Sequence, residues 1–208
     1  MAVIAMIGAA FGCRPHNSSP SSAVSWSFSA TAPSDASHGE QRAAPREKHP
    51  RGEHRGALDK DDGVVPDGAT VFDDAVPAVA ELDPDLLRAL RRAATDAADD
   101  GVEFYVNSGW RSPEYQNRLL REAVSEYGSE KEAARWAATA ETSLHVKGEA
   151  VDIGHSDATT WLSRNGARYG LCQIYRNEPW HYELRPEAID HGCPPLYADP
   201  TRDPRLQQ

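Results

Sequence analysis

The sequence of 208 residues lacks several features that would each point to a class of protein. It has no excess of basic residues, because 22 Lys and Arg stand against 32 Asp and Glu and give a net charge of −10. A protein that binds nucleic acid through its phosphates needs the opposite balance, so this class is excluded. No apolar run approaches the roughly 20 residues of a transmembrane helix, so we expect no membrane span. No internal repeat is present, and the chain has only 3 cysteines.

The first 66 residues differ in composition from the rest of the chain. They hold 7 basic and 7 acidic side chains, so the whole net charge of −10 falls on residues 67–208. Residues 1–12 form a short apolar stretch that ends at Cys13. This pattern resembles the end of a bacterial lipoprotein signal, so we interpret residues 1–13 as the remnant of an export signal with Cys13 as the lipidated residue. The alternative, an apolar N-terminus of a cytoplasmic protein, stays open.

Residues 14–66 are rich in Ser, Pro, Gly, Ala and mixed charges and have almost no apolar periodicity. Such a segment cannot bury enough apolar surface to offset the entropy of ordering its backbone, so we predict a disordered tether. Its 4 scattered histidines are better explained by a solvated linker than by a metal site. We therefore expect the folded domain over residues 67–208, which are enough for one hydrophobic core.

Helix caps and apolar spacing predict the elements of this domain. Asp83 and Pro84 begin a helix that Gly101 ends. Helices are also predicted from Ser112 to Gly128, from Ser129 through Ala137 and over 158–165, and strands over 102–106, 150–153, 172–175 and 180–184. Helices come first and most strands later, which favours a single α+β domain with a small antiparallel sheet flanked by helices. Residues 191–208 are rich in Pro and Asp and predict an irregular, ordered strap over the core.

Residues that bind metals or transfer protons are concentrated in a few short stretches. His145, Asp152 and His181 offer two imidazoles and a carboxylate, which is the ligand set of a catalytic zinc that keeps one position for water. Glu178, three residues before His181, provides a base for that water. On spacing alone, hydrogen-bonded polar residues without a metal are an equal alternative.

Three sequence blocks resemble one family. The pattern Ser-x-His-x-x-Gly-x-Ala-x-Asp from Ser143 to Asp152, followed by Glu-Pro-Trp-His from Glu178 to His181, is similar to the zinc D-alanyl-D-alanine carboxypeptidases. This family includes the vancomycin-resistance carboxypeptidases and dipeptidases and shares its fold with the hedgehog signalling domain. The block Ser-Gly-Trp-Arg-Ser over 108–112 resembles a third family motif. The resemblance covers about residues 80–190 and implies a hedgehog/D,D-peptidase-like fold.

The resemblance also implies roles for individual residues. His145, Asp152 and His181 would bind Zn²⁺, and Glu178 would act as general base and acid. Arg111 would stabilise the oxyanion, a role that suits its permanently charged guanidinium.

Four further residues are implied as substrate-binding: Ser143, Tyr115, Gln116 and Trp180. Their residue types leave alternatives open, because Ser143 also suits a turn and Tyr115 also suits the core. For Trp180, inward packing is slightly favoured over a place in the pocket wall. Tyr182 and Glu183 point to opposite faces of their predicted strand, so we expect one of them to orient the ligand His181.

The family implies an enzyme that removes the terminal D-Ala from peptidoglycan stem peptides or precursors and contributes to glycopeptide resistance. Residues 67–208 would then be a monomeric zinc D,D-carboxypeptidase domain, secreted or lipid-anchored at the outer face of a bacterial cell membrane. The alternatives are a D-Ala-D-Ala dipeptidase, a stem-peptide endopeptidase and a non-catalytic hedgehog-like cell-wall-binding module. An export signal and a tether favour the carboxypeptidase over a dipeptidase acting on cytoplasmic precursors. Glu178 and Arg111 argue against a module that only binds.

Cys172 and Cys193 lie on either side of the Glu178–His181 block. In the oxidising compartment that an export signal implies, we predict that these two residues form a disulfide. The alternatives are two separate buried thiols or a cysteine ligand to zinc.

Overall fold

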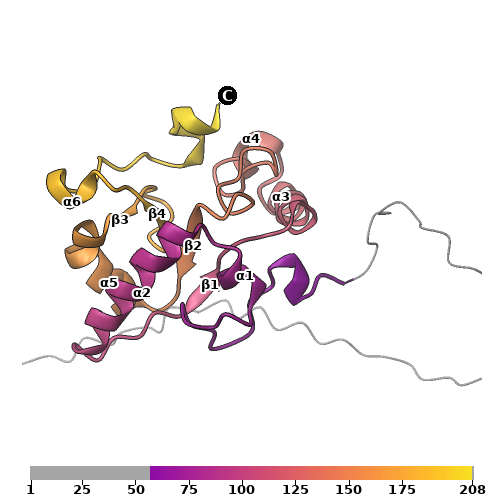
Figure 1. Ribbon diagram of the computed structural model, residues 1–208. Helices are drawn as coiled ribbons and strands as arrows, with labels where there is room; N and C mark the ends of the chain where they lie inside the picture. Colours follow the sequence, from indigo (N-terminus) through magenta and orange to yellow (C-terminus); the bar gives the residue numbers. More distant parts are fainter. Residues whose placement is uncertain (1–56, 208) are drawn as a thin grey trace, which may run out of the picture. The chain divides into compact units, whose positions relative to one another are not determined.

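A four-stranded antiparallel sheet organises residues 57–207, the part of the chain that the computed structural model describes (Figure 1). The strands follow the order β1-β2-β4-β3. Their bounds are β1 Val106–Ser108, β2 Ala150–Ile153, β3 Leu171–Gln173 and β4 His181–Leu184. The expected α+β class with a small antiparallel sheet is confirmed. Cys13 and the predicted export signal lie outside the described residues, as does the predicted tether up to residue 56.

Six α-helices surround the sheet in the described part of the chain. They are α1 Pro77–Ala80, α2 Pro84–Ala98, α3 Pro113–Tyr127, α4 Glu130–Ala133, α5 Ser156–Asn165 and α6 Ala188–His191. The predicted caps are present, since the Asp83 side chain accepts from the backbone at the start of α2 and the Ser112 hydroxyl does so for α3. Helix α3 ends at Gly128 with a left-handed φ of 77°, as expected for a glycine C-cap.

One face of the sheet carries the main hydrophobic core. Val151 of β2 lies opposite Tyr182 of β4, and both side chains are buried in the cluster that includes Leu86 and Leu90 of α2 and Trp161 of α5. Because side chains alternate along a strand, the neighbours Asp152 and His181 point to the opposite face, where they are register partners. The register of β2 and β4 therefore brings two predicted metal ligands together.

A C-terminal strap, residues 192–207, packs on this second face next to the predicted ligands. Its 3₁₀ turns are η3 Pro200–Arg202 and η4 Pro204–Leu206. Tyr197 and Leu206 pack against a second small core that contains Cys172, Ile174 and Tyr175. In Figure 1 the strap (yellow) crosses above the end of the sheet formed by β3 and β4. The predicted irregular strap is thus ordered by apolar contacts.

Several predicted boundaries are wrong. Residues 57–66 belong to the fold and not to the tether, because Asp59 caps the 3₁₀ turn η1 Lys60–Asp62 and Asp62 accepts a hydrogen bond from the Ser112 hydroxyl. The first strand begins at Val106 and not at residue 102. Just before it, Tyr105 pairs with Thr70 in an isolated bridge, which is too short to count as a strand. The strand expected over 172–175 spans 171–173, since Tyr175 pairs with Tyr197 of the strap. The helix expected from Ser129 through Ala137 stops at Ala133.

The predicted disulfide between Cys172 and Cys193 is present and ties the start of the strap to β3. It closes a loop with a sequence separation of 21 residues. Replacing both cysteines with serine is expected to lower the free energy of unfolding by about 3 kcal/mol, because the unfolded chain then gains the entropy of the opened loop. Urea unfolding of the oxidised protein and the double variant measures this loss, and equal midpoints would contradict the prediction.

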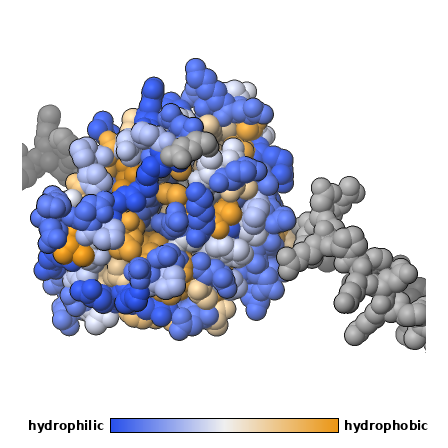
Figure 2. All heavy atoms as spheres, turned by 45° about the horizontal axis from the view of Figure 1, so that its top comes forward, coloured by the Kyte–Doolittle hydropathy of each residue, from blue (hydrophilic) through white to orange (hydrophobic). Residues whose placement is uncertain are grey.

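Within residues 57–207, none of the helices combines the length and the apolar character that crossing a membrane requires. The surface viewed in Figure 2 is mostly hydrophilic, with hydrophobic side chains in small separate patches.

Candidate metal centre

His145 is held in a buried loop before β2 by contacts to its ring and its backbone. Its Nδ1 lies 2.8 Å from the carbonyl oxygen of Gly109. Because a carbonyl can only accept, Nδ1 carries the proton, and the lone pair of Nε2 faces the other two residues of the cluster. The loop turns at Gly148, whose φ is +75° and where a Cβ would lie 2.5 Å from the Glu81 carbonyl oxygen, so glycine is required there.

Asp152 on β2 presents its two carboxylate oxygens to different partners. Oδ2 accepts a hydrogen bond of 2.8 Å from the Arg111 guanidinium. Oδ1 points toward the two histidines and lies 3.4 Å from His145 Nε2 and 3.4 Å from His181 Nδ1. The ion pair therefore fixes the carboxylate with one oxygen turned into the cluster.

His181 on β4 is oriented by Glu183, two residues along the same face. The Nε2 atom of His181 lies 3.3 Å from Glu183 Oε1. A carboxylate is an acceptor, so this contact places the ring proton on Nε2 and leaves Nδ1 directed at His145 and Asp152. Of the two candidates expected to orient His181, Glu183 does so, whereas Tyr182 is buried on the core face.

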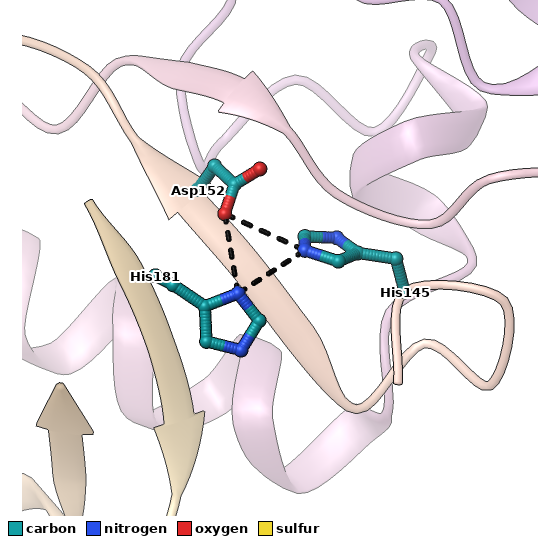
Figure 3. Close-up of side chains that lie close together, drawn as sticks. All are labelled: His145, Asp152 and His181. Atoms are coloured by element: carbon teal, nitrogen blue, oxygen red, sulfur yellow. Dashed lines mark hydrogen bonds and ion pairs between the residues drawn. The ribbon is translucent and has the colours of Figure 1, made fainter. Parts of the chain in front are cut away.

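The three side chains converge on one point, with the rings and the carboxylate turned toward one another (Figure 3). His145 Nε2 lies 3.3 Å from His181 Nδ1, which completes a triangle with the two 3.4 Å distances to Asp152 Oδ1. Ligands at about 2.0–2.1 Å from a tetrahedral zinc are about 3.3–3.4 Å apart, so the triangle fits one face of such a tetrahedron. Asp152 Oδ1 is also one of three buried side-chain atoms in residues 57–207 without a hydrogen-bond partner. The residues therefore fit a metal ion.

Glu178 borders the cluster and is buried. Its Oε2 lies 3.6 Å from His181 Nδ1, whereas its Oε1 is another of the unpartnered buried atoms of the described chain. Burial raises the pKa of the Glu178 carboxyl to about 7, which suits a group that accepts a proton near neutral pH and returns it.

The carboxylates in the cluster stabilise a positive charge placed next to them. Burial opposes the ionisation of Asp152, but its contacts with the two histidines outweigh this and hold the pKa of Asp152 well below its ordinary value. Burial likewise disfavours a charged His181, yet the nearby carboxylates of Asp152 and Glu183 raise its pKa to about 10. The pKa of His145 is lowered by burial and by the positive Arg111.

Arg111 is anchored by three side chains. Besides Asp152, it donates from Nε to the Ser108 hydroxyl at 2.7 Å and from Nη1 to Gln116 Oε1 at 3.0 Å. Three of its five N–H groups are thus used, and two remain for another acceptor. The predicted site residue Arg111 therefore also orients the Asp152 carboxylate, a role that sequence reasoning did not find.

The four predicted substrate-binding residues differ in their surroundings. Gln116 is buried, and its amide links Arg111 to the backbone oxygen of Ala138 at 2.8 Å, so both ends are bound to the protein. Ser143 is buried two residues before His145, and Tyr115 is half-buried. Trp180 is 39% exposed, so the favoured inward packing is wrong. The next residue, His181, takes the buried position instead.

Three residues of the centre went unnoticed in the sequence. Arg205 and Asp203 come from the C-terminal strap, and Tyr175 follows β3. They form a hydrogen-bonded network with Glu183, in which only Arg205 is partly exposed. The sequence of the strap contains no motif that would indicate a contact with Glu183. The Arg-Pro-Asp-rich character of its end was the only available signal.

Two histidines and one aspartate around a common point, with a buried glutamate beside them, match the ligand set and base that metal-dependent hydrolases use. The profile of the VanY family, described as D-alanyl-D-alanine carboxypeptidase, matches residues 79–187. The chain belongs to this family. A D-alanyl-D-alanine carboxypeptidase of Enterococcus faecalis is 36% identical over an alignment that covers 41% of each chain. The chain thus spans about two fifths of the length of this curated relative.

Two solved structures with similarity to the chain carry the name VanY. VanYB in complex with D-alanine-D-alanine is 29% identical, with a TM-score of 0.49 over 53% of this chain and 74% of that one. A mutant of the vancomycin-resistance D,D-pentapeptidase VanY in complex with Zn(II) is 30% identical, with a TM-score of 0.46 over 50% of this chain and 72% of that one.

Proposed function

We propose that the protein is a zinc-dependent D,D-carboxypeptidase that removes the terminal D-Ala from peptidoglycan stem peptides. The observation that carries this proposal is the buried triangle of His145, Asp152 and His181 with the Glu178 carboxylate at its side. Membership of the VanY family supports the choice of substrate class.

His145 Nε2, Asp152 Oδ1 and His181 Nδ1 would hold the zinc. When bound, zinc supplies a Lewis acid that polarises the scissile carbonyl and lowers the pKa of water. Gly109 and Glu183 fix the ring protons on the nitrogens that face away from the cluster, so both histidines present lone pairs to the metal.

Glu178 takes the role of proton carrier. Its buried carboxylate accepts a proton from the attacking water and then donates it to the amine of the leaving D-Ala. The unpartnered Oε1 is the atom that suits this transfer, because no donor within residues 57–207 competes for it.

Arg111 stabilises the negative charge that develops on the carbonyl oxygen. Its guanidinium is held in place by Ser108, Gln116 and Asp152, so it needs no reorganisation during the reaction. Two N–H groups remain for the substrate. Ser143 and Trp180 are the proposed contacts for the rest of the peptide, Ser143 from its place near His145 and Trp180 from its exposed ring.

We further propose that the enzyme acts outside the cytoplasm, anchored through Cys13 or secreted, and contributes to glycopeptide resistance by shortening stem peptides. The presence of a disulfide supports an oxidising compartment.

Mass spectrometry of the zinc-loaded protein with a stem pentapeptide that ends in D-Ala-D-Ala tests the activity. Loss of one alanine, abolished by a chelator, is expected. Free D-Ala-D-Ala serves as a parallel substrate, and its cleavage alone would identify a dipeptidase. No product from either substrate, at one bound zinc per chain, would overturn the proposed activity.

Zinc is expected to stabilise the protein more strongly as the pH rises from 6 to 8. With a pKa of about 10, His181 holds a proton in the metal-free protein, and zinc must displace it. The raised pKa of Glu178 stabilises the metal-free fold at low pH, and this contribution is lost as the pH rises through about 7. Both effects therefore make the stabilisation by zinc larger at higher pH.

Melting temperatures of zinc-loaded and chelator-treated protein at pH 6, 7 and 8 measure this dependence. The difference between the two melting temperatures should grow with pH, and a difference that shrinks would contradict the assignment of His181 and Glu178.

A further inference from the structure

A network of polar side chains, buried except for the partly exposed Arg205, connects His181 to the C-terminal strap, which lies beyond the family-matched residues 79–187. Glu183 Oε1 contacts His181 Nε2 at 3.3 Å. On its other side, Glu183 accepts two hydrogen bonds from Arg205 of the strap, with Nη1 at 2.8 Å from Oε2 and Nη2 at 3.3 Å from Oε1. One residue, Glu183, therefore separates Arg205 from a proposed metal ligand.

The Glu183 carboxylate depends on this partner for its orientation. Its side chain is only 2% exposed, so its charge needs cations close by. Arg185 also contacts it, but at Oε2 alone. Arg205 reaches both carboxylate oxygens with its planar guanidinium, which fixes the rotation of the carboxylate and not only its position.

Arg205 is itself held on the strap by a second buried carboxylate. Asp203 is fully buried, and it accepts hydrogen bonds from the Arg205 side chain and from the Tyr175 hydroxyl, the latter at 2.9 Å. The ring of Tyr175 also lies 5.0 Å from that of His181. The contacts thus run from His181 through Glu183, Arg205 and Asp203 to Tyr175, whose ring returns to His181.

The strap is attached at several points before it reaches the network. Cys193 is bonded to Cys172, and Tyr197 exchanges backbone hydrogen bonds with Arg176 and Ile174 at 2.9 and 3.0 Å. Asp199 pairs with Arg135 at 3.2 Å. These attachments give Arg205 a defined position relative to β4.

We propose that Arg205 is a positioning residue of the metal centre and that the C-terminal strap is an integral part of that centre. Arg205 holds the Glu183 carboxylate in the orientation that keeps the proton of His181 on Nε2 and its Nδ1 lone pair toward the metal. This inference rests on the proposed zinc site. Loss of such an outer partner typically weakens metal binding by about 10–100-fold.

The test compares zinc dissociation constants of full-length variants, measured by competition with a chromophoric chelator. Arg205→Met is expected to bind zinc about 10–100-fold more weakly than the unmodified chain, and Arg205→Lys to recover part of the loss. Arg202→Met is the matched control, because Arg202 is an exposed arginine of the same strap. The visible spectrum of the Co²⁺-loaded protein should change in Arg205→Met and not in Arg202→Met. A merely structural role of Arg205 would not produce such a change.

A double variant, Arg205→Met with Glu183→Gln, keeps the proposal testable if the single variant does not fold, since it removes the buried charge together with its partner. It should show the same weakening of zinc binding. Zinc affinity within twofold of the unmodified chain in either folded variant would overturn the proposal, as would an equal loss in Arg202→Met. Because these measurements need no peptide, absence of hydrolysis in the unmodified chain would refute the proposed activity and leave the positioning role standing.

Discussion

Replacing Glu178 with glutamine is expected to reduce the hydrolysis of a D-Ala-D-Ala stem peptide by about 1000-fold. Glutamine has the same shape but cannot take up and return a proton, so the step that activates water loses its base. Zinc affinity should stay close to that of the unmodified protein, because His145, Asp152 and His181 are unchanged. Rates from mass spectrometry and zinc competition measure the two quantities separately.

Glu149→Gln is the control for this experiment, because Glu149 is an exposed carboxylate close to the ligands in the sequence. Its rate should match that of the unmodified chain. Full activity in Glu178→Gln would refute the role of Glu178 as the base of the reaction.

Replacing His145 with alanine is expected to weaken zinc binding by more than about 100-fold, since even loss of an outer partner costs up to that amount. Hydrolysis should fall with it at any zinc concentration that loads the unmodified protein. The reason is geometric, because Asp152 and His181 alone leave one corner of the triangle without a ligand. Zinc content after dialysis and chelator competition provide the measurement.

His191→Ala, which changes an exposed histidine on α6, controls for the general effect of removing an imidazole. It should retain one zinc per chain. If His145→Ala also retained one zinc with unchanged affinity, the ligand set would be wrong, and the short distances within the cluster would reflect ordinary hydrogen bonding.

Arg111 and Arg205 each donate hydrogen bonds to a carboxylate next to or within the candidate metal centre. Arg111 holds the outer oxygen of Asp152, and Arg205 holds the carboxylate behind His181. Both ligands are thus supported by an arginine from a distant part of the chain, 41 residues away for Asp152. In a buried site, such partners keep the ligands in one orientation, which lowers the entropy lost when a metal binds.

Local sequence patterns were sufficient to predict the helix caps, the strand alternation and the candidate metal ligands. Asp83, Ser112 and Ser129 cap helices because their short side chains satisfy backbone N–H groups within two or three residues. The alternation in β2 put Asp152 on the face opposite Val151, and the disulfide followed from the two remaining cysteines. The caps and the alternation depend on residues close together in the chain, and the disulfide had only two cysteines to choose from.

The contacts between distant residues around the site depend on how the chain folds and could not be read from local patterns. The pairing of β2 with β4 placed Asp152 opposite His181, and the path of the strap brought Arg205 to Glu183, 22 residues away in the chain. No periodicity in residues 192–207 predicts that contact, because the strap is held by long-range apolar packing and ion pairs. The exposure of Trp180 was decided in the same way, since the register of β4 gave the buried position to His181.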